Sequence, residues 1–559
     1  MKKPLLSELT LEQKIGQLLL GYQWDICRKT EIDHNIFRTW EEREDVLRKE
    51  KYGSLWAQTG TASRGTDMAE FSHGEVDKSS EYGAFLQRES DCYEIPALTC
   101  LDAEASGAGP LFWDLTTTCP PLAMGATNDE ELVYEMGAAI ARELRCAGVN
   151  WRWTPVVDLC GKYTHSVIRS YSPHDTDKQV RLALAHARGM QSEGVAATAK
   201  HFPGGAGPAH EKIGFIDSHF CSHSLDISKE EWQKEAGSVF QRMIDGGIYS
   251  IMISHRGFPA VDNSVVNGRI RPSTISKKVI TDLLKNEMGF DGVVITDGIQ
   301  MASLYTLMPY EDLIVEIVNA GNDVILGVQP NTGEIIKQAV LDGRISIDRI
   351  NDGCRRVLDM KEKLGLFDDG YRLVKSTSDI EAPKTREVNM KVARKAVTLI
   401  RDRENILPFS KDKVKNVTII VSTHADYFID KLQPLKKEFE DRGAQVTIQR
   451  RLVNNEALAE ISEKNDLIIY ATYVGPHEPM GPPSLFGDEL KTYLHAFTSG
   501  KEKTIGVSFG YPYMHHFIMQ GADAFINTYS VSAEMMKALA ETIYGEIPFE
   551  GESPVDLNM

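Results

Sequence analysis

Two groups of reactive side chains lie close together in the middle of the chain. Lys200 and His201 directly follow the apolar run 195–199, which predicts a short buried strand, and Asp217 and His219 come in the loop beyond. A carboxylate beside an imidazole fixes the imidazole tautomer and raises its basicity, as a general acid/base requires. An isolated Asp-x-His is more often structural. The prediction of proton-transfer chemistry therefore depends on what surrounds this pair.

Asp297 is the best-defined single candidate for a nucleophile. It follows the apolar run 292–296 and precedes Gly298. A carboxylate held at the end of a buried strand is a suitable nucleophile for attack on the anomeric carbon of a sugar. The competing interpretation is a helix N-cap, a position that Asp also favours.

The elements that would position these residues recur at regular intervals up to about residue 330. Short apolar runs alternate with segments of helical period, and this pattern predicts a parallel sheet buried on both faces. Eight such strands predict a closed TIM-type (β/α)8 barrel. The eight runs are 17–22, 52–57, 97–101, 150–157, 195–199, 248–253, 292–296 and 323–326.

Charged residues follow several of these strands in succession, and in such a barrel they converge on the face where active sites lie. Asp102, Arg169, Lys200 and His201 suit the recognition of sugar hydroxyls, because charged and bidentate groups bind hydroxyls well. We also place His255, after the sixth strand, among the substrate-binding residues. The predicted substrate-binding set is Asp102, Arg169, Lys200, His201 and His255.

The second part of the chain has its own strand pattern. Residues 1–366 are predicted to form the barrel, the polar, turn-rich residues 367–390 a linker, and residues 391–559 a smaller domain. Helices separate the later strands, so this domain is predicted to be an α/β sandwich with a doubly wound sheet. Its expected strands are 417–422, 466–471, 504–508 and 522–526.

Composition restricts the possible partners and the compartment. The chain has 559 residues and a net charge of −18, which argues against nucleic-acid binding and against a polybasic membrane contact. The N-terminus lacks a secretory pattern, and none of the eight cysteines form a Cys-x-x-Cys pair, so we expect a cytoplasmic protein with reduced thiols. His219 and His223 are four residues apart but lack the Glu of a His-Glu-x-x-His motif, so no metal and no cofactor are predicted.

Taken together, these segments resemble glycoside hydrolase family 3 over nearly the whole chain. The combination is specific, although any single segment is not. The segments that carry the resemblance are Leu9–Leu18, Leu101–Glu104, Pro120–Ala126, Arg169–Tyr171, Lys200–Gly204, Phe290–Asp297 and Tyr544–Phe549.

The resemblance implies retaining hydrolysis of β-glycosides through a covalent glycosyl-enzyme on Asp297. It implies that Asp102, Arg169, Lys200 and His201 bind the sugar. Asp217-Ser218-His219 is similar to the Asp-His dyad of the β-N-acetylglucosaminidase branch, in which His is the acid/base. The loop 205–216 is longer than is usual in that branch.

Alternatives remain open at this point. A β-glucosidase or β-xylosidase would take a carboxylate acid from the second domain, with Glu478 as the candidate. Phosphate could replace water as acceptor, which would make the protein a glycoside phosphorylase. A non-catalytic sugar-binding protein on the same scaffold is the third alternative. The sequence leaves the sugar identity and the oligomeric state undetermined, and the expected partner is an oligosaccharide or glycoside substrate.

Overall fold

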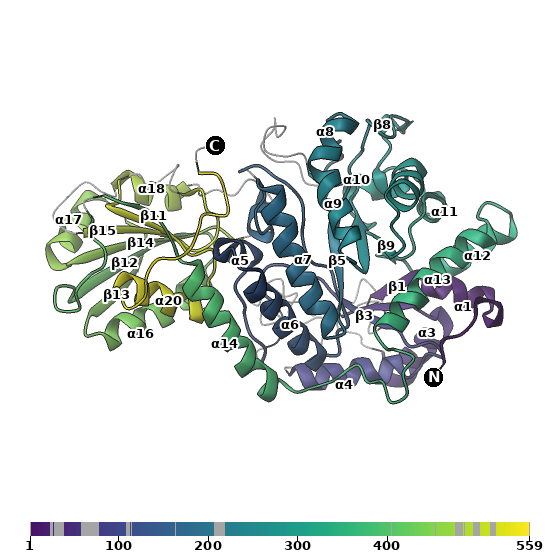
Figure 1. Cartoon of the computed structure of the whole chain (residues 1–559), viewed down its shortest axis with the longest axis horizontal. Coiled ribbons are helices and arrows are strands. Elements are labelled where there is room, and N and C mark those ends of the chain that lie inside the picture. The colour runs from purple at the N-terminus through teal and green to yellow at the C-terminus, as the bar shows by residue number, and fades with distance from the viewer. Residues whose placement is uncertain are drawn as a thin grey trace.

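The fold consists of two α/β units side by side (Figure 1). The computed structural model describes residues 2–22, 26, 38–57, 78–107, 112, 114–162, 164–205, 219–403, 405–452, 454–475, 485, 487–495, 503–514 and 521–557. Within these ranges an eight-stranded sheet and a six-stranded sheet form the two units. A small hairpin, β7 (Val265–Val266) and β8 (Arg269–Ile270), lies outside both sheets.

The eight-stranded sheet is a parallel barrel. Its strand order is β10-β1-β2-β3-β4-β5-β6-β9, and each neighbouring pair runs parallel. A parallel bridge between Ile295 and Val324 joins the first and last strands of this order. The predicted barrel and its eight strands are therefore confirmed. The strands are β1 (Leu19–Tyr22), β2 (Ser54–Trp56), β3 (Leu98–Leu101), β4 (Trp151–Arg152), β5 (Ala196–Phe202), β6 (Ser250–Ile253), β9 (Val293–Thr296) and β10 (Ile325–Leu326).

Side chains that alternate along the strands fill the barrel interior. Trp151 lies in this inner cluster with Leu98 and Ile295. Its indole N–H donates to the hydroxyls of Thr198 at 2.8 Å and Ser250 at 2.9 Å. The interior is thus a packed core, and the reactive groups lie above it, at the carboxyl ends of the strands. We call that end of the barrel the mouth.

Helices surround the barrel, and their termini carry the expected capping residues. Asp129 and Asp175 cap the two long neighbouring helices α6 and α7, each accepting a backbone N–H of the first turn. The helices are α1 (Leu11–Gln17), α3 (Trp40–Glu50), α4 (Ser79–Ser90), α5 (Pro121–Thr127), α6 (Glu130–Cys146), α7 (Thr176–Ser192), α8 (Lys229–Lys234), α9 (Ala236–Asp245), the π-helix η6 (Lys278–Glu287), α10 (Ala302–Tyr305), α11 (Tyr310–Ala320), α12 (Thr332–Leu341) and α13 (Ile347–Lys363). Short 3-10 turns are η1 (Leu6–Glu8), η3 (His165–Arg169) and η5 (Ser273–Ile275).

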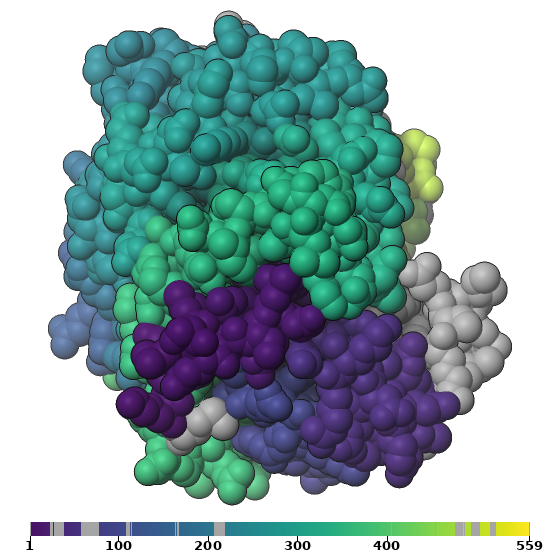
Figure 2. Space-filling view, turned by 90° about the vertical axis from the view of Figure 1, so that its right-hand side faces the viewer, coloured from purple at the N-terminus to yellow at the C-terminus, as the bar shows by residue number. Residues whose placement is uncertain are grey.

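The start of the chain lies against the end of the barrel. Figure 2 shows the purple N-terminal segment beside the green segment that contains α12 and α13. Lys3 pairs with Asp359 at 2.5 Å, and Glu12 pairs with Lys337 at 2.9 Å. These ion pairs join α13 and α12 to the segment that leads into β1, so they reinforce the closure of the barrel.

The second sheet has the order β11-β16-β15-β14-β12-β13 and is parallel except for the pair β11–β16. The sequence predicted the four inner strands but not the two edges, which are more polar and less buried. The strands are β11 (Thr398–Asp402), β12 (Asn416–Thr423), β13 (Gln445–Arg450), β14 (Leu467–Tyr473), β15 (Lys503–Ser508) and β16 (Ala524–Asn527). Its helices are α15 (Phe428–Lys431), α16 (Gln433–Asp441), α17 (Asn455–Lys464), α18 (Gly487–His495) and α20 (Ala533–Ile543).

Helix α14 (Ser378–Ala396) lies between the two units and packs on α5 and α6 of the barrel and on α20 (Figure 1). It begins inside the range 367–390, so the later half of the predicted linker is helical. The domain boundaries themselves stay a prediction. Within the described part of the chain, none of the helices has the length and apolar character needed to cross a membrane.

Candidate active site

Lys200 lies at the centre of a charged group at the mouth. Its ammonium is 3.0 Å from a carboxylate oxygen of Asp102 and also pairs with Glu104. The Lys200 and Glu104 side chains are 2% and 4% exposed, whereas that of Asp102 is 41% exposed. Asp102 and Glu104 follow β3 two residues apart, so they face the same side of the chain. The arrangement leaves Asp102 accessible to a ligand and holds Lys200 in place.

Arg169 completes this group, because it pairs with the second oxygen of Glu104. We call Asp102, Glu104, Arg169 and Lys200 the mouth cluster. Burial alone would lower the pKa of both cations, but the neighbouring carboxylates outweigh it and raise both pKa values. Both cations therefore stay charged near neutral pH. They can donate hydrogen bonds to hydroxyl groups of a ligand.

His201 is oriented by Asp158, the residue that follows β4 and its extension. The ring Nδ1 lies 2.7 Å from one carboxylate oxygen of Asp158, and the backbone N–H of His201 donates to the other at 3.2 Å. Burial alone would raise the pKa of Asp158, but His201 and Arg256 hold that pKa at about 2. An ionised Asp158 places the proton on Nδ1, so Nε2 of His201 is the nitrogen left for a ligand.

Asp297 directly follows β9 and is partly exposed. Its Oδ1 accepts the backbone N–H of Gly298 at 2.8 Å. Burial alone would raise the pKa of Asp297, but His201, His255, Lys200 and this N–H outweigh it and hold the pKa below its usual value. The carboxylate is therefore ionised at neutral pH, as a nucleophile must be.

The helix-cap interpretation of Asp297 is wrong, because the next helix, α10, begins at Ala302 and has Met301 at its N-cap position. His255 is fully buried beside Asp297, and both of its ring nitrogens have protein partners. Nδ1 lies 2.6 Å from the Thr274 hydroxyl and Nε2 lies 2.8 Å from the Gly298 carbonyl. His255 therefore holds the peptide that follows Asp297, and a direct contact with substrate stays a prediction.

His219 lies on the loop beside the segment that follows Asp297. Its carbonyl accepts the backbone N–H of Ala302 at 3.2 Å. Burial lowers the pKa of His255, and the charge of the nearby His219 contributes to that lowering. His219 therefore lies near the mouth, beside His255 and the segment after Asp297. Asp217, its predicted partner, lies outside the described residues.

Two members of this site were not predicted as site residues, namely Glu104 and Asp158. Glu104 alternates with Asp102 after the third strand, and this period of two is the signal that places both on one face. Asp158 follows an apolar run, which places it at a strand end with the other charged groups. Both act on a predicted ligand-binding residue, Glu104 through Lys200 and Asp158 through His201.

The second sheet touches the barrel through the loop after β15. The Tyr511 hydroxyl donates to the carbonyl of Lys162, and the Tyr513 hydroxyl is 2.5 Å from Nε2 of His174. The backbone N–H of Tyr511 also bonds the carbonyl of Val474, just beyond β14, at 3.2 Å. The chain that follows β14 thus starts beside Tyr511, a residue that contacts the barrel. Glu478, the alternative acid, lies outside the described residues.

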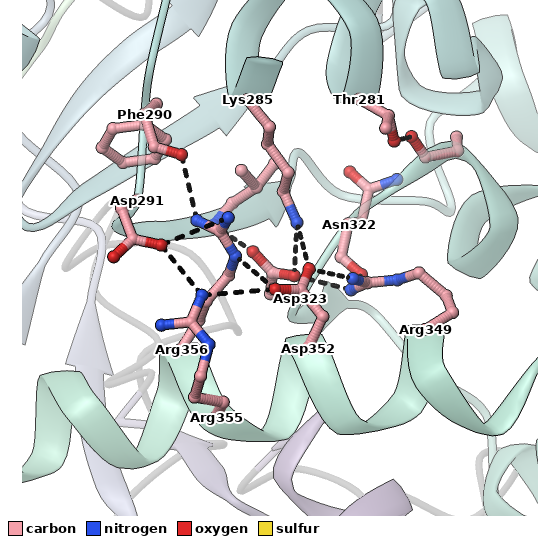
Figure 3. Close-up of polar contacts among 12 residues, drawn as sticks. Thr281, Lys285, Phe290, Asp291, Asn322, Asp323, Arg349, Asp352, Arg355 and Arg356 are labelled. Atoms are coloured by element: carbon pink, nitrogen blue, oxygen red, sulfur yellow. Dashed lines mark hydrogen bonds and ion pairs between the residues drawn. The ribbon is translucent and has the colours of Figure 1, made fainter.

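A second charged group occupies the opposite end of the barrel (Figure 3). Asp323, which precedes β10, pairs with Lys285 at 2.7 Å and with Arg349 at 2.6 Å, and it accepts the backbone N–H of Val294 at 3.0 Å. Arg356 donates to the carbonyl of Gly292 at 2.9 Å. We call this group the basal ion cluster; its members are Lys285, Asp291, Asp323, Arg349, Asp352, Arg355 and Arg356.

Comparisons with known proteins agree with this architecture. A model of the glycosyl hydrolase family 3 N-terminal domain matches residues 10–360. The β-N-acetylglucosaminidase/β-glucosidase of Cellulomonas fimi is 25% identical over 492 residues, which cover 83% of this chain and 84% of that protein.

Two solved structures are similar over nearly their whole length. One is the β-glucoside phosphorylase BglX bound to 2FGlc, with a TM-score of 0.80 and 23% identity over 99% of this chain and 95% of that chain. The other is a glycoside hydrolase family 3 β-N-acetylglucosaminidase from Paenibacillus sp. str. FPU-7, with a TM-score of 0.77 and 23% identity over 98% and 99% of the two chains. Both likenesses show the same two-part fold.

Proposed function

This chain belongs to glycosyl hydrolase family 3 and is a glycoside hydrolase acting on β-glycosides, and we propose that it is a retaining, exo-acting enzyme that forms a glycosyl-enzyme on Asp297. The observation that carries the proposal is the environment of Asp297, an ionised carboxylate at a barrel strand end with the mouth cluster beside it. Its Oδ1 is bonded to Gly298, so Oδ2 is the oxygen free to attack.

In the first step, a hydroxyl-rich sugar is bound by Asp102, Lys200 and Nε2 of His201. Oδ2 of Asp297 attacks the anomeric carbon, the bond to the leaving-group oxygen breaks, and a general acid gives that oxygen a proton. In the second step, the residue that served as general acid now acts as base and takes a proton from water. The oxygen of that water attacks the anomeric carbon and releases Asp297. Two displacements at one carbon retain its configuration.

We assign the acid/base role to His219, with Asp217 as its orienting partner. The Asp-Ser-His spelling and the bond from Ala302 to the His219 carbonyl support this assignment. The substrate would then be a β-N-acetylglucosaminide. The name of the relative from Cellulomonas fimi includes this class of substrate together with β-glucosides. Because a neutral imidazole repels phosphate less than a carboxylate does, phosphorolysis is a variant of the same proposal.

The second candidate is a β-glucosidase or β-xylosidase with Glu478 as the acid. The contacts of the 509–514 loop with the barrel favour it, because the chain beyond β14 starts beside them. A panel of aryl β-glycosides, assayed with and without inorganic phosphate, tests both candidates. The first predicts highest kcat/KM on the N-acetylglucosaminide, and the second predicts it on the glucoside or xyloside. Absence of turnover on every member would refute both and favour a sugar-binding protein.

A further inference from the structure

Arg152 is a buried cation that the proposed mechanism does not use. It lies on β4, its neighbour Trp151 points into the barrel, and its own side chain contacts His186 and Met190 of α7 on the outside of the wall. The residue is 1% exposed, and none of the described carboxylates forms an ion pair with it. Glu104 and Asp102 attract this charge through space, but a buried charge with no carboxylate in contact is still costly, so an apolar residue would suit this position better if packing were its only role.

The backbone explains what the guanidinium does there. The N–H of Trp153 donates to the carbonyl of Leu101 at 3.1 Å, as expected for paired parallel strands. Two residues farther along, the matching pair would be Ala103 and Pro155, but proline has no N–H to donate. Arg152 supplies the missing donor, since its Nε–H bonds the Ala103 carbonyl at 2.7 Å and Nη2 bonds the same oxygen.

Ala103 is the residue between Asp102 and Glu104, the two carboxylates that hold Lys200. A carbonyl held from outside the wall fixes the peptide plane on which the direction of both carboxylates depends. Arg152 therefore acts on the mouth cluster without touching it or a substrate.

The hydrogen bonds of Arg152 also lead, through His186, toward the Arg169 side of the mouth cluster. A guanidinium can only donate, so Nε2 of His186 accepts from Arg152 across 3.4 Å, and the imidazole, buried and neutral, carries its proton on Nδ1. That Nδ1 is hydrogen-bonded to the hydroxyl of Tyr171, two residues after Arg169. One chain of contacts thus joins the segment after β3 to the loop that carries Arg169.

We propose that Arg152 is a positioning residue for the active site, which holds the Ala103 peptide so that Asp102 and Glu104 both face Lys200, with His186 and Tyr171 linking it to the Arg169 loop. The kinetic part of this inference rests on the proposed function. The structural part does not.

Arg145 provides a matched control. It is equally buried and bonds three backbone carbonyls, those of Gly194, Arg372 and Leu373, away from the mouth cluster. Arg152→Met and Arg145→Met therefore remove the same kind of group from two places. Both are expected to lower the melting temperature, but only Arg152→Met is expected to lower kcat/KM of the folded enzyme, by about 100-fold, because small misplacements of binding groups have effects of that size. Arg145→Met is expected to stay within about 2-fold.

A double-mutant cycle separates positioning from general damage. If Arg152 acts through Glu104, Arg152→Met adds little to the loss caused by Glu104→Gln, whereas independent effects multiply. Arg152→Lys keeps the charge and one donor, so its kcat/KM is expected between those of wild type and Arg152→Met. If Arg152→Met does not fold, Arg152→Lys and His186→Asn replace it in the cycle, with the same expected non-additivity.

Hydrogen exchange of the wild-type protein and the variants gives a readout independent of turnover. Peptides covering 98–107 are expected to exchange faster in Arg152→Met but not in Arg145→Met. Equal kcat/KM in the two methionine variants, multiplicative losses in the cycle, or unchanged exchange at 98–107 would overturn the inference. If the wild-type enzyme turned over no glycoside, the proposed function would fail and the exchange result alone would decide the positioning role.

Discussion

The two ends of the barrel carry charged clusters of similar composition that are built for different purposes. In the basal ion cluster, Asp323 is fully buried and saturated by Lys285, Arg349 and the Val294 N–H. In the mouth cluster, Glu104 is equally saturated, but Asp102 keeps 41% of its side chain exposed. The buried centre of the basal network is closed around Asp323, and its outer members Asp291, Asp352 and Arg355 reach solvent, whereas the mouth network exposes Asp102, a carboxylate bonded to the buried Lys200.

The difference shows how charge near a barrel can be assigned to stability or to chemistry. The basal ion cluster at the amino ends of the strands joins β9, β10, η6 and α13, and its exposed members are paired with one another (Figure 3). At the carboxyl ends, Lys200 and His201 contribute to the lowered pKa of Asp297, a group that lies outside their ion pairs. Substitutions at the two ends are therefore expected to change different measured quantities.

The largest effect is expected from Asp297→Ala, because no covalent intermediate forms without the carboxylate. We expect kcat to fall on the order of 10⁴-fold or more, by analogy with the loss of other catalytic groups. The melting temperature is expected to stay close to that of wild type, since only the Gly298 N–H loses a partner. Steady-state kinetics and thermal unfolding check this, and a variant with substantial activity would show that the mouth is not used as described.

His219→Ala is expected to have the next largest effect, and only on substrates that need an acid. Hydrolysis of glycosides with poor leaving groups should fall about 10²–10⁴-fold, the usual contribution of general acid/base catalysis, while activated aryl glycosides lose far less. Glu478→Ala is the matched comparison. If it shows this dependence on the leaving group and His219→Ala does not, the acid is Glu478 and the glucosidase-type candidate replaces the first.

Asp323→Ala tests the opposite end. Removing one partner of a buried ion network leaves Lys285 and Arg349 uncompensated, so the free energy of unfolding is expected to fall by about 3–5 kcal/mol. The kcat/KM of the folded fraction should remain near that of wild type. Urea unfolding together with kinetics at low temperature measures both. A large loss of kcat/KM without loss of stability would remove the distinction between the two ends.

Among the mouth substitutions, the smallest loss of turnover is expected from Lys200→Ala, which removes one predicted contact to the sugar. Since this change also takes a buried partner from Glu104, a lower melting temperature is expected too. A buried polar contact of this kind contributes about 1–3 kcal/mol, so kcat/KM should fall about 5- to 150-fold, with KM raised. Kinetics on the preferred aryl glycoside measures this. Normal KM and kcat on every glycoside of the panel would reassign Lys200 to a purely structural role.

The barrel was predictable because eight apolar runs have the right length and spacing, and the residues after them could be placed at one end for the same reason. Asp102, Lys200, His201 and Asp297 were placed at the mouth in this way, and their roles stay predictions. Which groups pair could not be predicted, because Glu104 reaches Lys200 and Arg169 only across the neighbouring strands β3, β4 and β5, and the partners are 65 to 96 residues away along the chain.

The polar edge strands β11 and β13 carry little apolar signal, so periodicity could not identify them. The basal ion cluster was not predicted from the sequence, for a different reason. Its cations lie on η6 and α13, where charged residues normally face solvent, and only the packing of α13 against the barrel buries Lys285 and Arg356. Arg152 was also missed, because a single charge in a two-residue strand has no periodic signal.

The most direct measurement for the central claim is covalent trapping of the intermediate. An activated 2-deoxy-2-fluoro β-glycoside, or the matching N-acetylglucosaminide analogue, slows release of the glycosyl group from the nucleophile. Mass spectrometry of the digested enzyme is expected to find one added glycosyl group on the peptide that contains Asp297, and Asp297→Ala is expected to remain unlabelled. Time-dependent inactivation with the label on another residue, or equal labelling of Asp297→Ala, would contradict the account.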